Sequence, residues 1–284
     1  MTAPRGDAPD GLLRGGYLVR REVLDRVGSA LREARTDALL VKGAGLAETV
    51  YPEPWRREMA DVDLVVRTAD LERTLDALAG LGAEVIPVPR ERRHSYVTLS
   101  ERAAIVRVGP AAVTVEIHTS LDKVVPHRID WPAIFLRAAE VTGLPTSLRV
   151  PSPEDHALLV IVHAALSDLR HPVAWDDLDR LWRAGLDDAR FAARATDWKL
   201  ATASTVVLEA WATRHPEHDV SGVVRALGVG ALRRRLVSRA FVDSAPRTNG
   251  WRWTLRQSAL RDDPLRYAIG LTSYALRRAA DRFA

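Results

Sequence analysis

The chain has 284 residues, 47% of them hydrophobic and 27% charged, which is the composition of a globular protein with one large domain or two ordinary ones. It has no cysteine, which excludes disulfides, thiolate metal sites and cysteine nucleophiles. The N-terminus lacks the pattern of a signal peptide and no uncharged apolar run approaches the ~20 residues that span a bilayer, so we expect a cytoplasmic protein without a transmembrane segment.

The formal net charge of +4 is unevenly distributed along the chain. From Ser221 to the end, 13 arginines stand against four aspartates, so this part is strongly basic. A basic segment can bind nucleic acid, an anionic membrane surface or an anionic substrate. The aromatic residues are not interleaved with the arginines as densely as in a nucleic-acid platform. We therefore expect helices with solvated arginine faces and no nucleic-acid partner, with binding of RNA along these helices as the alternative.

The first half of the chain predicts an alternation of helices and strands. Residues 1–16 are rich in Gly, Pro and Asp, which predicts a flexible N-terminus. Hydrophobic periodicity then predicts a helix at 17–34, a strand at 37–43, a helix at 44–51, a strand at 61–66, a helix at 69–82, and strands at 83–88, 94–100, 103–108 and 112–118. This order predicts an α+β fold, with a mixed β-sheet that carries helices.

The pattern changes near residue 148. Ser152 is a good N-cap, Pro153 fits the first turn of a helix, and everything after them has helical periodicity. We therefore expect a mixed-sheet domain at 17–148 and an all-helical domain at 149–284 that covers the cleft of the first domain.

Two aspartates open the predicted strand at 61–66. Because side chains alternate between the two faces of a strand, Asp61 and Asp63 share one face and lie roughly 6.5 to 7 Å apart. Like charges at this distance need a nearby cation. The last predicted strand places Glu116 on one of its faces in the same way. If the two strands are neighbours, Asp61, Asp63 and Glu116 form one carboxylate cluster, which predicts a site for Mg²⁺ or Mn²⁺.

A glycine-rich turn precedes the acidic strand. The predicted strand at 37–43 ends in Lys42 and Gly43, and a helix begins at once with Ala44 and Gly45. The free backbone N–H groups and the positive dipole end of such a helix are a good site for phosphate, and Lys42 adds a positive charge. The turn therefore predicts a phosphate-binding site at these four residues.

Together these features resemble the uncharacterised nucleotidyltransferase family of the DNA-polymerase-beta-like nucleotidyltransferase superfamily. The stretches "LLVKGAGLAETVYPEPWRREMADVDLVV" and "VEIH" carry the resemblance, with weaker similarity in "SPEDHALLVIVHAAL" and "WDDLDRLW". The resemblance implies that the mixed β-sheet domain is of the nucleotidyltransferase type and that Asp61, Asp63 and Glu116 bind the metal. It also implies that the turn at Gly43 holds the phosphates of an NTP and that Arg57 reaches the triphosphate.

The resemblance also implies the reaction. A hydroxyl or phosphate of a small molecule, peptide or protein attacks the α-phosphorus of the NTP, its proton passes to Glu116, and pyrophosphate leaves as an NMP, expected to be AMP, is transferred. Many members of the superfamily carry Gly-Ser at the turn, whereas here Ala44 follows Gly43 and offers no hydroxyl. A pseudo-nucleotidyltransferase that binds a nucleotide or a partner without turnover is therefore the alternative.

Three histidines are candidates for an acceptor pocket. His118 lies on the face of Glu116 and either contacts the acceptor or is a hydrogen-bonded structural histidine. His156 and His163 share one face of a predicted helix and would line an acceptor pocket between the two domains. The sequence identifies neither the acceptor nor the oligomeric state.

Overall fold

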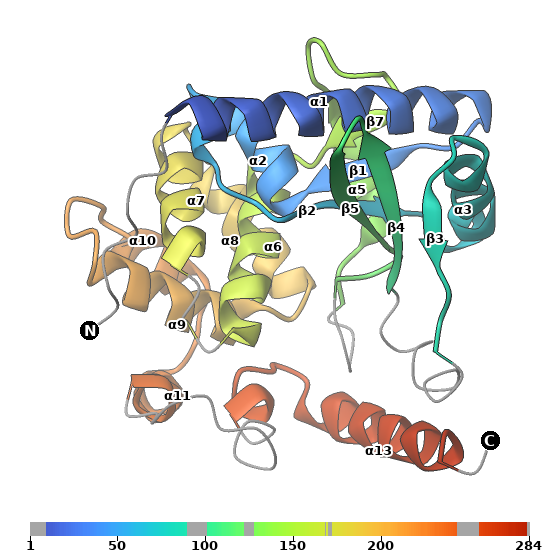
Figure 1. The fold of residues 1–284 in the computed structure, drawn as a ribbon. Helices are drawn as coiled ribbons and strands as arrows, with labels where there is room; N and C mark the ends of the chain where they lie inside the picture. The colour runs from blue at the N-terminus through green and yellow to red at the C-terminus, as the bar shows by residue number, and fades with distance from the viewer. Residues whose placement is uncertain are drawn as a thin grey trace. The chain divides into compact units, whose positions relative to one another are not determined.

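The structure is a computed structural model that describes residues 10–89, 101–121, 128–167, 169, 172–242 and 256–282 (Figure 1). The chain forms two compact units. The first unit contains Met1–Pro87, Glu101–Thr119 and Ala138–Val150, and the remainder of the chain belongs to the second. The two units are interleaved in sequence.

The first unit contains a mixed β-sheet with helices. Its elements are α1 (Asp10–Glu33), β1 (Ala38–Val41), α2 (Lys42–Val50), η1 (Pro54–Arg56), β2 (Asp61–Val66), η2 (Thr68–Asp70), α3 (Leu71–Gly80), β3 (Glu84–Ile86), β4 (Glu101–Val108), β5 (Ala111–His118), β6 (Ala139–Glu140) and β7 (Leu148–Val150). The predicted α+β class is confirmed, and so are the predicted helices and strands that fall on described residues, within a few residues at their ends. The strand predicted at 94–100 lies outside the described residues.

The prediction of a flexible N-terminus over residues 1–16 is wrong from Asp10 onward, where α1 begins. The glycines of this segment weaken a helix, but tertiary contacts compensate for them. The guanidinium carbon of Arg14 lies 4.5 Å from the centre of the Trp55 ring, and a carboxylate oxygen of Asp10 lies 3.6 Å from the guanidinium of Arg56. Neither contact can be recognised from local composition.

The periodicity did not predict the elements between the last long strand and residue 150. Strands β6 and β7 span only two and three residues, too few for an alternating pattern to be recognised. Strand β7 pairs in parallel with β1, so its place in the sheet depends on a partner more than a hundred residues earlier in the chain. The short helix α5 (Trp131–Arg137), also not predicted, belongs to the second unit.

The seven strands form one sheet in the order β3-β4-β5-β2-β1-β7-β6. The pairs β2–β5 and β1–β7 are parallel, and the other neighbours are antiparallel. Figure 1 shows β2 and β5 together near the middle of the sheet, and α2 beginning where β1 ends. The acidic strand is therefore a central strand with a partner on each side.

One face of the sheet is packed against helices. The helix α1 contacts β4, β5 and α3, and alternate residues of the central strands are buried beneath it. The main members of this core are Val23, Leu24, Val27 and Leu31 from α1, Leu75 and Leu78 from α3, and Leu40, Val62, Leu64, Val66, Val113, Val115 and Ile117 from the strands. Because side chains alternate, Asp61, Asp63 and Glu116 belong to the opposite face.

Close packing of α1 requires a glycine in its middle. A Cβ built on Gly28 would lie 2.5 Å and 2.6 Å from the ring carbons Cβ and Cγ of Pro145, and 3.2 Å from a methyl carbon of Leu148. The hydroxyl of Ser147 also donates a hydrogen bond of 2.6 Å to the carbonyl of Gly28. Helix α1 thus approaches the segment before β7 at a distance that only glycine permits.

We expect Gly28→Ala to lower the free energy of unfolding by about 1–3 kcal/mol, since the rigid proline ring cannot move aside without shifting the backbone. The matched control is Gly15→Ala in the same helix, where a Cβ meets nothing within 4 Å. This control should leave stability unchanged or raise it by about 0.5–1 kcal/mol, because alanine favours a helix more than glycine does. Thermal and urea unfolding measure both variants, and equal effects at the two positions would contradict the packing argument.

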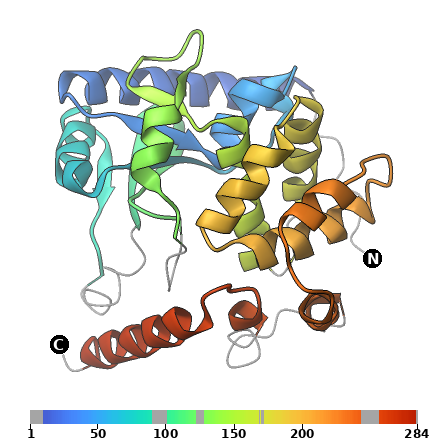
Figure 2. The ribbon, with the colours of Figure 1, turned by 180° about the vertical axis from the view of Figure 1, so that it is seen from behind.

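The described part of the second unit is built from α-helices (Figure 2). They are α5, α6 (Pro153–Leu166), α7 (Pro172–Arg183), α8 (Asp188–Asp197), α9 (Ala201–Ala212), α10 (Ser221–Ala226), α11 (Ala231–Val242) and α13 (Pro264–Ala280). The predicted N-cap is confirmed, because the Ser152 side chain accepts a hydrogen bond from the backbone N–H of Asp155. Helices α6 and α9 are buried along most of their lengths. Among the described residues, no helix combines the length and the apolar character needed to cross a bilayer.

Candidate functional site

The parallel pairing of β2 with β5 brings the predicted carboxylates together. In this register Asp63 lies opposite Glu116, and Asp61 lies opposite Thr114. Paired residues in neighbouring strands point to the same face of a sheet, so the acidic face of β2 continues into that of β5. The expectation that these two strands are neighbours is confirmed.

The carboxylate of Asp63 is the centre of this cluster. Its Oδ1 atom accepts hydrogen bonds from the ammonium group of Lys42, at 2.5 Å, and from Nε2 of His118, at 2.9 Å. The same imidazole nitrogen lies 3.4 Å from Oε2 of Glu116. Asp63 and His118 are only 4% and 3% exposed, so they interact in surroundings from which most water is excluded. Lys42 and His118 thus offset the free-energy cost of burying the Asp63 carboxylate.

These contacts perturb the protonation equilibria of the cluster. Burial raises the pKa of Asp61, and the charges of Asp63 and Glu116 raise it further. Burial alone would also raise the pKa of Asp63, but the hydrogen bond from His118 and the charge of Lys42 outweigh burial and leave that pKa below its usual value. Burial acts in the opposite direction on His118, yet its hydrogen bonds with Asp63 and Glu116 raise its pKa. The site therefore concentrates negative charge that favours any added cation.

The donor set fits a divalent cation that prefers oxygen ligands. One ligand atom each from Asp63, Glu116 and His118 lie within 4.8 Å of one another. Carboxylate oxygens are the usual protein ligands of Mg²⁺ and Mn²⁺. Asp61 is not part of this closest group, although the charges of the other two carboxylates, together with burial, raise its pKa. The imidazole of His118 is the member that the sequence did not predict as a neighbour of Asp63.

The turn between β1 and α2 places Lys42 beside the acids. The antiparallel register pairs Val41 with Asp63, so the next residue of the chain is within reach of the same carboxylate. Lys42 itself has φ of +49°, in the left-handed region that non-glycine residues seldom adopt. Such a conformation costs about 1–3 kcal/mol and is typical of functional sites. Helix α2 has no side-chain cap at its N-terminus, where the N–H groups of its first turn begin.

Arg57 packs against the start of this helix. The side chain is largely buried, with the residue 8% exposed, and its Nη1 donates a hydrogen bond of 2.5 Å to the carbonyl of Glu58. A Cβ built on Gly43 would lie 3.1 Å from that Nη1 and 3.2 Å from Cβ of Met59. The glycine therefore leaves room for the guanidinium group beside the turn.

We expect Gly43→Ala to displace Arg57, because the added methyl group is closer to the guanidinium and to Met59 than ordinary contacts allow. The expected loss is about 1–2 kcal/mol in the free energy of unfolding, with weaker protection of the fold by an NTP and Mg²⁺. Gly80→Ala is the matched control, since a Cβ there meets nothing within 4 Å. Thermal unfolding with and without nucleotide measures both effects, and an unaltered nucleotide-dependent shift in Gly43→Ala would contradict a role for this turn.

The other predicted residues lie in different surroundings. Ala44 is 4% exposed and belongs to the hydrophobic core, so its methyl group serves packing. Gly45 lies within the buried first half of α2. His156 and His163 lie on α6 in the second unit, the first of them 1% exposed, and their role in an acceptor pocket stays a prediction. His118 is a buried, hydrogen-bonded histidine, which was one of its two alternatives.

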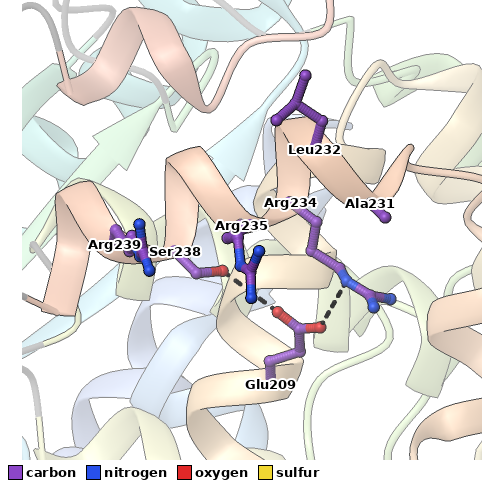
Figure 3. A pocket seen from close by; sticks show the side chains of 7 residues that line it. All are labelled: Glu209, Ala231, Leu232, Arg234, Arg235, Ser238 and Arg239. Carbon is purple, nitrogen blue, oxygen red and sulfur yellow. Dashed lines mark hydrogen bonds and ion pairs between the residues drawn. The ribbon is translucent and has the colours of Figure 1, made fainter.

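The second unit contains a cavity with a different character (Figure 3). It has a volume of about 680 Å³ and is lined by Glu209, Ala231, Leu232, Arg234, Arg235, Ser238 and Arg239. Its carboxylate is already engaged, at 3.2 Å from Nε of Arg234 and 3.2 Å from the hydroxyl of Ser238. The cavity is basic and does not offer the carboxylate cluster that a divalent cation requires.

Comparison with known proteins gives the family. The solution structure of antibiotic-resistance factor ANT(2'')-Ia has 16% sequence identity to this chain and a TM-score of 0.41, over 70% of this chain and 98% of its own. No curated protein matches the sequence. The family described as "Uncharacterised nucleotidyltransferase" matches residues 18–212, more than half of the chain. The chain therefore belongs to this family of uncharacterised nucleotidyltransferases, which confirms both the resemblance and the enzyme class predicted from the sequence.

Proposed function

We propose that this nucleotidyltransferase moves an NMP, with ATP as the expected donor, to a hydroxyl or phosphate of a small molecule, peptide or protein, and releases pyrophosphate. The observation that carries the proposal is the parallel register of β2 and β5, which sets Asp63 opposite Glu116 on one sheet face. The start of α2 lies beside the same carboxylates, because Lys42 contacts Asp63. Carboxylates and a helix N-terminus in this arrangement suit a metal–triphosphate substrate.

Asp61, Asp63 and Glu116 would hold Mg²⁺ or Mn²⁺. When bound, such an ion neutralises charge on the triphosphate and on the departing pyrophosphate. The first N–H groups of α2 would hold phosphate oxygens, and Lys42 and Arg57 would add positive charge beside them. Glu116 is 25% exposed in its side chain, which leaves it accessible to an acceptor hydroxyl whose proton it would take.

The buried imidazole of His118 has a positioning role in this proposal. Its Nε2 donates a hydrogen bond of 2.9 Å to Asp63 and lies 3.4 Å from Glu116, so it links the two carboxylates across the strand pair. A link of this kind holds both carboxylates in fixed rotamers, which lowers the entropy lost when a cation and substrate bind.

The experiment is an assay of pyrophosphate release with each of the four NTPs, in Mg²⁺ and in Mn²⁺. Cell extract supplies the acceptor, and mass spectrometry with labelled NTP identifies the molecule that gains an NMP. The expected result is metal-dependent pyrophosphate release together with one labelled product. Label transferred equally well in the presence of excess chelator would contradict a metal-dependent reaction.

The alternative, a protein that binds a nucleotide without turnover, is favoured by one observation, the absence of a hydroxyl at Ala44. The same experiment separates the two functions. A thermal shift with Mn²⁺ and NTP, without pyrophosphate or labelled product after extract and acceptor panels have been tried, supports the alternative.

A further inference from the structure

A second cluster of metal-ligating side chains lies in the helical unit, away from any residue used above. The loop that follows α9 carries the sequence His215-Pro216-Glu217-His218, and Asp179 on α7 faces it. Oδ1 of Asp179 lies 2.7 Å from Nε2 of His218 and 3.9 Å from Nδ1 of His215. Oε1 of Glu217 lies 3.5 Å from Nδ1 of His215 and 3.9 Å from Nε2 of His218.

We propose that Asp179, His215, Glu217 and His218 form a Zn²⁺ site that ties the loop after α9 to helix α7. In a tetrahedral site with Zn²⁺–ligand distances of about 2.0–2.1 Å, neighbouring ligand atoms lie about 3.3–3.4 Å apart. Four of the six pairwise distances among these ligand atoms run from 2.7 to 3.9 Å and so lie on both sides of that value. One ligand atom each from Asp179, His215 and Glu217 lie within 4.8 Å of one another. His218 lies outside this closest group, and a rotation of its side chain, which already contacts Asp179, would bring its Nε2 atom to the same ion.

Aromatic packing holds the two imidazoles in place. The ring of Trp211 stacks on that of His218, with centroids 4.7 Å apart and an interplanar angle of 21°, and its centroid lies 5.7 Å from that of His215. Trp182 of α7 packs on Trp211 in turn, with centroids 5.2 Å apart. Ligands fixed in this way lose little entropy when an ion binds.

An arginine bridges the two carboxylates in this structure. Nε of Arg183 lies 2.8 and 2.9 Å from the two carboxylate oxygens of Asp179, and its Nη2 lies 3.3 Å from Oε1 of Glu217. The Arg183 side chain is 59% exposed, so it can leave the site for solvent at little cost. Arg183 therefore competes with a metal ion for the same oxygen atoms.

The ligand set indicates both the metal and its role. Two imidazoles with two carboxylates favour Zn²⁺ over Mg²⁺, which prefers oxygen ligands only. Four protein ligands leave no open position for substrate, which is typical of structural sites rather than catalytic ones. The site would stabilise the helical unit by linking segments more than thirty residues apart in sequence.

The test is Zn²⁺ binding by the full chain, measured by calorimetry after treatment with chelator. All proteins carry Asp63→Asn, so that the carboxylate site of the first unit is altered equally in each. We expect His218→Ala to weaken Zn²⁺ binding by at least ~10-fold. Glu217→Gln should also weaken Zn²⁺ binding. Because the Glu217 side chain is 49% exposed, this variant should fold and provides the test if His218→Ala does not fold. His163→Ala is the control for loss of a histidine and should bind Zn²⁺ as the parent does.

Arg183→Gln gives a result that a purely structural ion pair does not predict. Removal of the competing guanidinium should strengthen Zn²⁺ binding severalfold, whereas Arg190→Gln, which removes a similar exposed pair with Asp187, should leave it unchanged. Zn²⁺ should also raise the melting temperature of the chain that carries Asp63→Asn alone, and Mg²⁺ should not. Zn²⁺ affinity that is the same in the parent, His218→Ala and Glu217→Gln, or that falls in Arg183→Gln, would overturn the proposal.

Discussion

Asp63→Asn is expected to reduce metal-dependent pyrophosphate release at least ~10³-fold, the largest effect of any single substitution in this chain. The amide keeps the shape of the side chain but removes the negative charge that a divalent cation needs. It also removes the ion pair with Lys42 and weakens the hydrogen bond with His118. Because Asp63 is only 4% exposed, the free energy of unfolding should fall by about 1–3 kcal/mol.

The control for this variant is Asp76→Asn on α3, an exposed aspartate in the same unit. It should retain full turnover and stability. Circular dichroism and thermal unfolding show whether Asp63→Asn is folded at the assay temperature, so that loss of turnover can be assigned to chemistry. Removal of a catalytic electrostatic group typically reduces turnover by much more than ~10-fold. If folded Asp63→Asn keeps turnover within a factor of about ten of the parent, this carboxylate does not bind the catalytic ion.

Glu116→Gln should reduce turnover by about 10²–10³-fold while leaving stability nearly unchanged. The reason for the contrast with Asp63 is exposure: the Glu116 side chain is 25% exposed, and its ion-pair partner His118 is 3.4 Å away. Loss of an interaction of this kind changes the free energy of unfolding by about 0.5 kcal/mol or less. Comparison of Asp63→Asn with Glu116→Gln thus separates the loss of turnover from the loss of stability.

A titration with Mn²⁺ distinguishes the two roles assigned to Glu116. If the residue acts mainly as a metal ligand, high Mn²⁺ concentrations restore part of the turnover of Glu116→Gln. If it acts mainly as the proton acceptor, turnover stays low at saturating Mn²⁺. Glu84→Gln, at an exposed position of β3 in the same sheet, is the control and should match the parent at every Mn²⁺ concentration. Full turnover of Glu116→Gln at every Mn²⁺ concentration would exclude both roles.

Local sequence pattern predicted most of the first unit. Alternating apolar residues identified β2, β4 and β5, and helical spacing identified α2 and α3, because these periodicities depend only on backbone geometry over a few residues. The same alternation placed Asp61 with Asp63 on one strand face. The residues around these acids and the turn at Gly43 were also sufficient to identify the family.

Other features depend on partners that are distant in sequence. The first turns of α1 contain several glycines and are held by contacts with Trp55 and Arg56, so composition alone predicted a flexible segment. The short strand β7 is defined by its pairing with β1. In each case the stabilising contact is tertiary, and local periodicity carries no information about it.

By itself, the sequence determined that this chain is an α+β nucleotidyltransferase with paired acids on a strand next to a glycine turn. Only the tertiary structure decided that β2 and β5 are parallel neighbours with Asp63 opposite Glu116, and that Lys42 and His118 both contact Asp63. It also decided that Asp179 meets the His-Pro-Glu-His loop. The physical reason is that side-chain periodicity is a local property of the backbone, whereas strand register and the meeting of distant side chains result from packing of the whole unit.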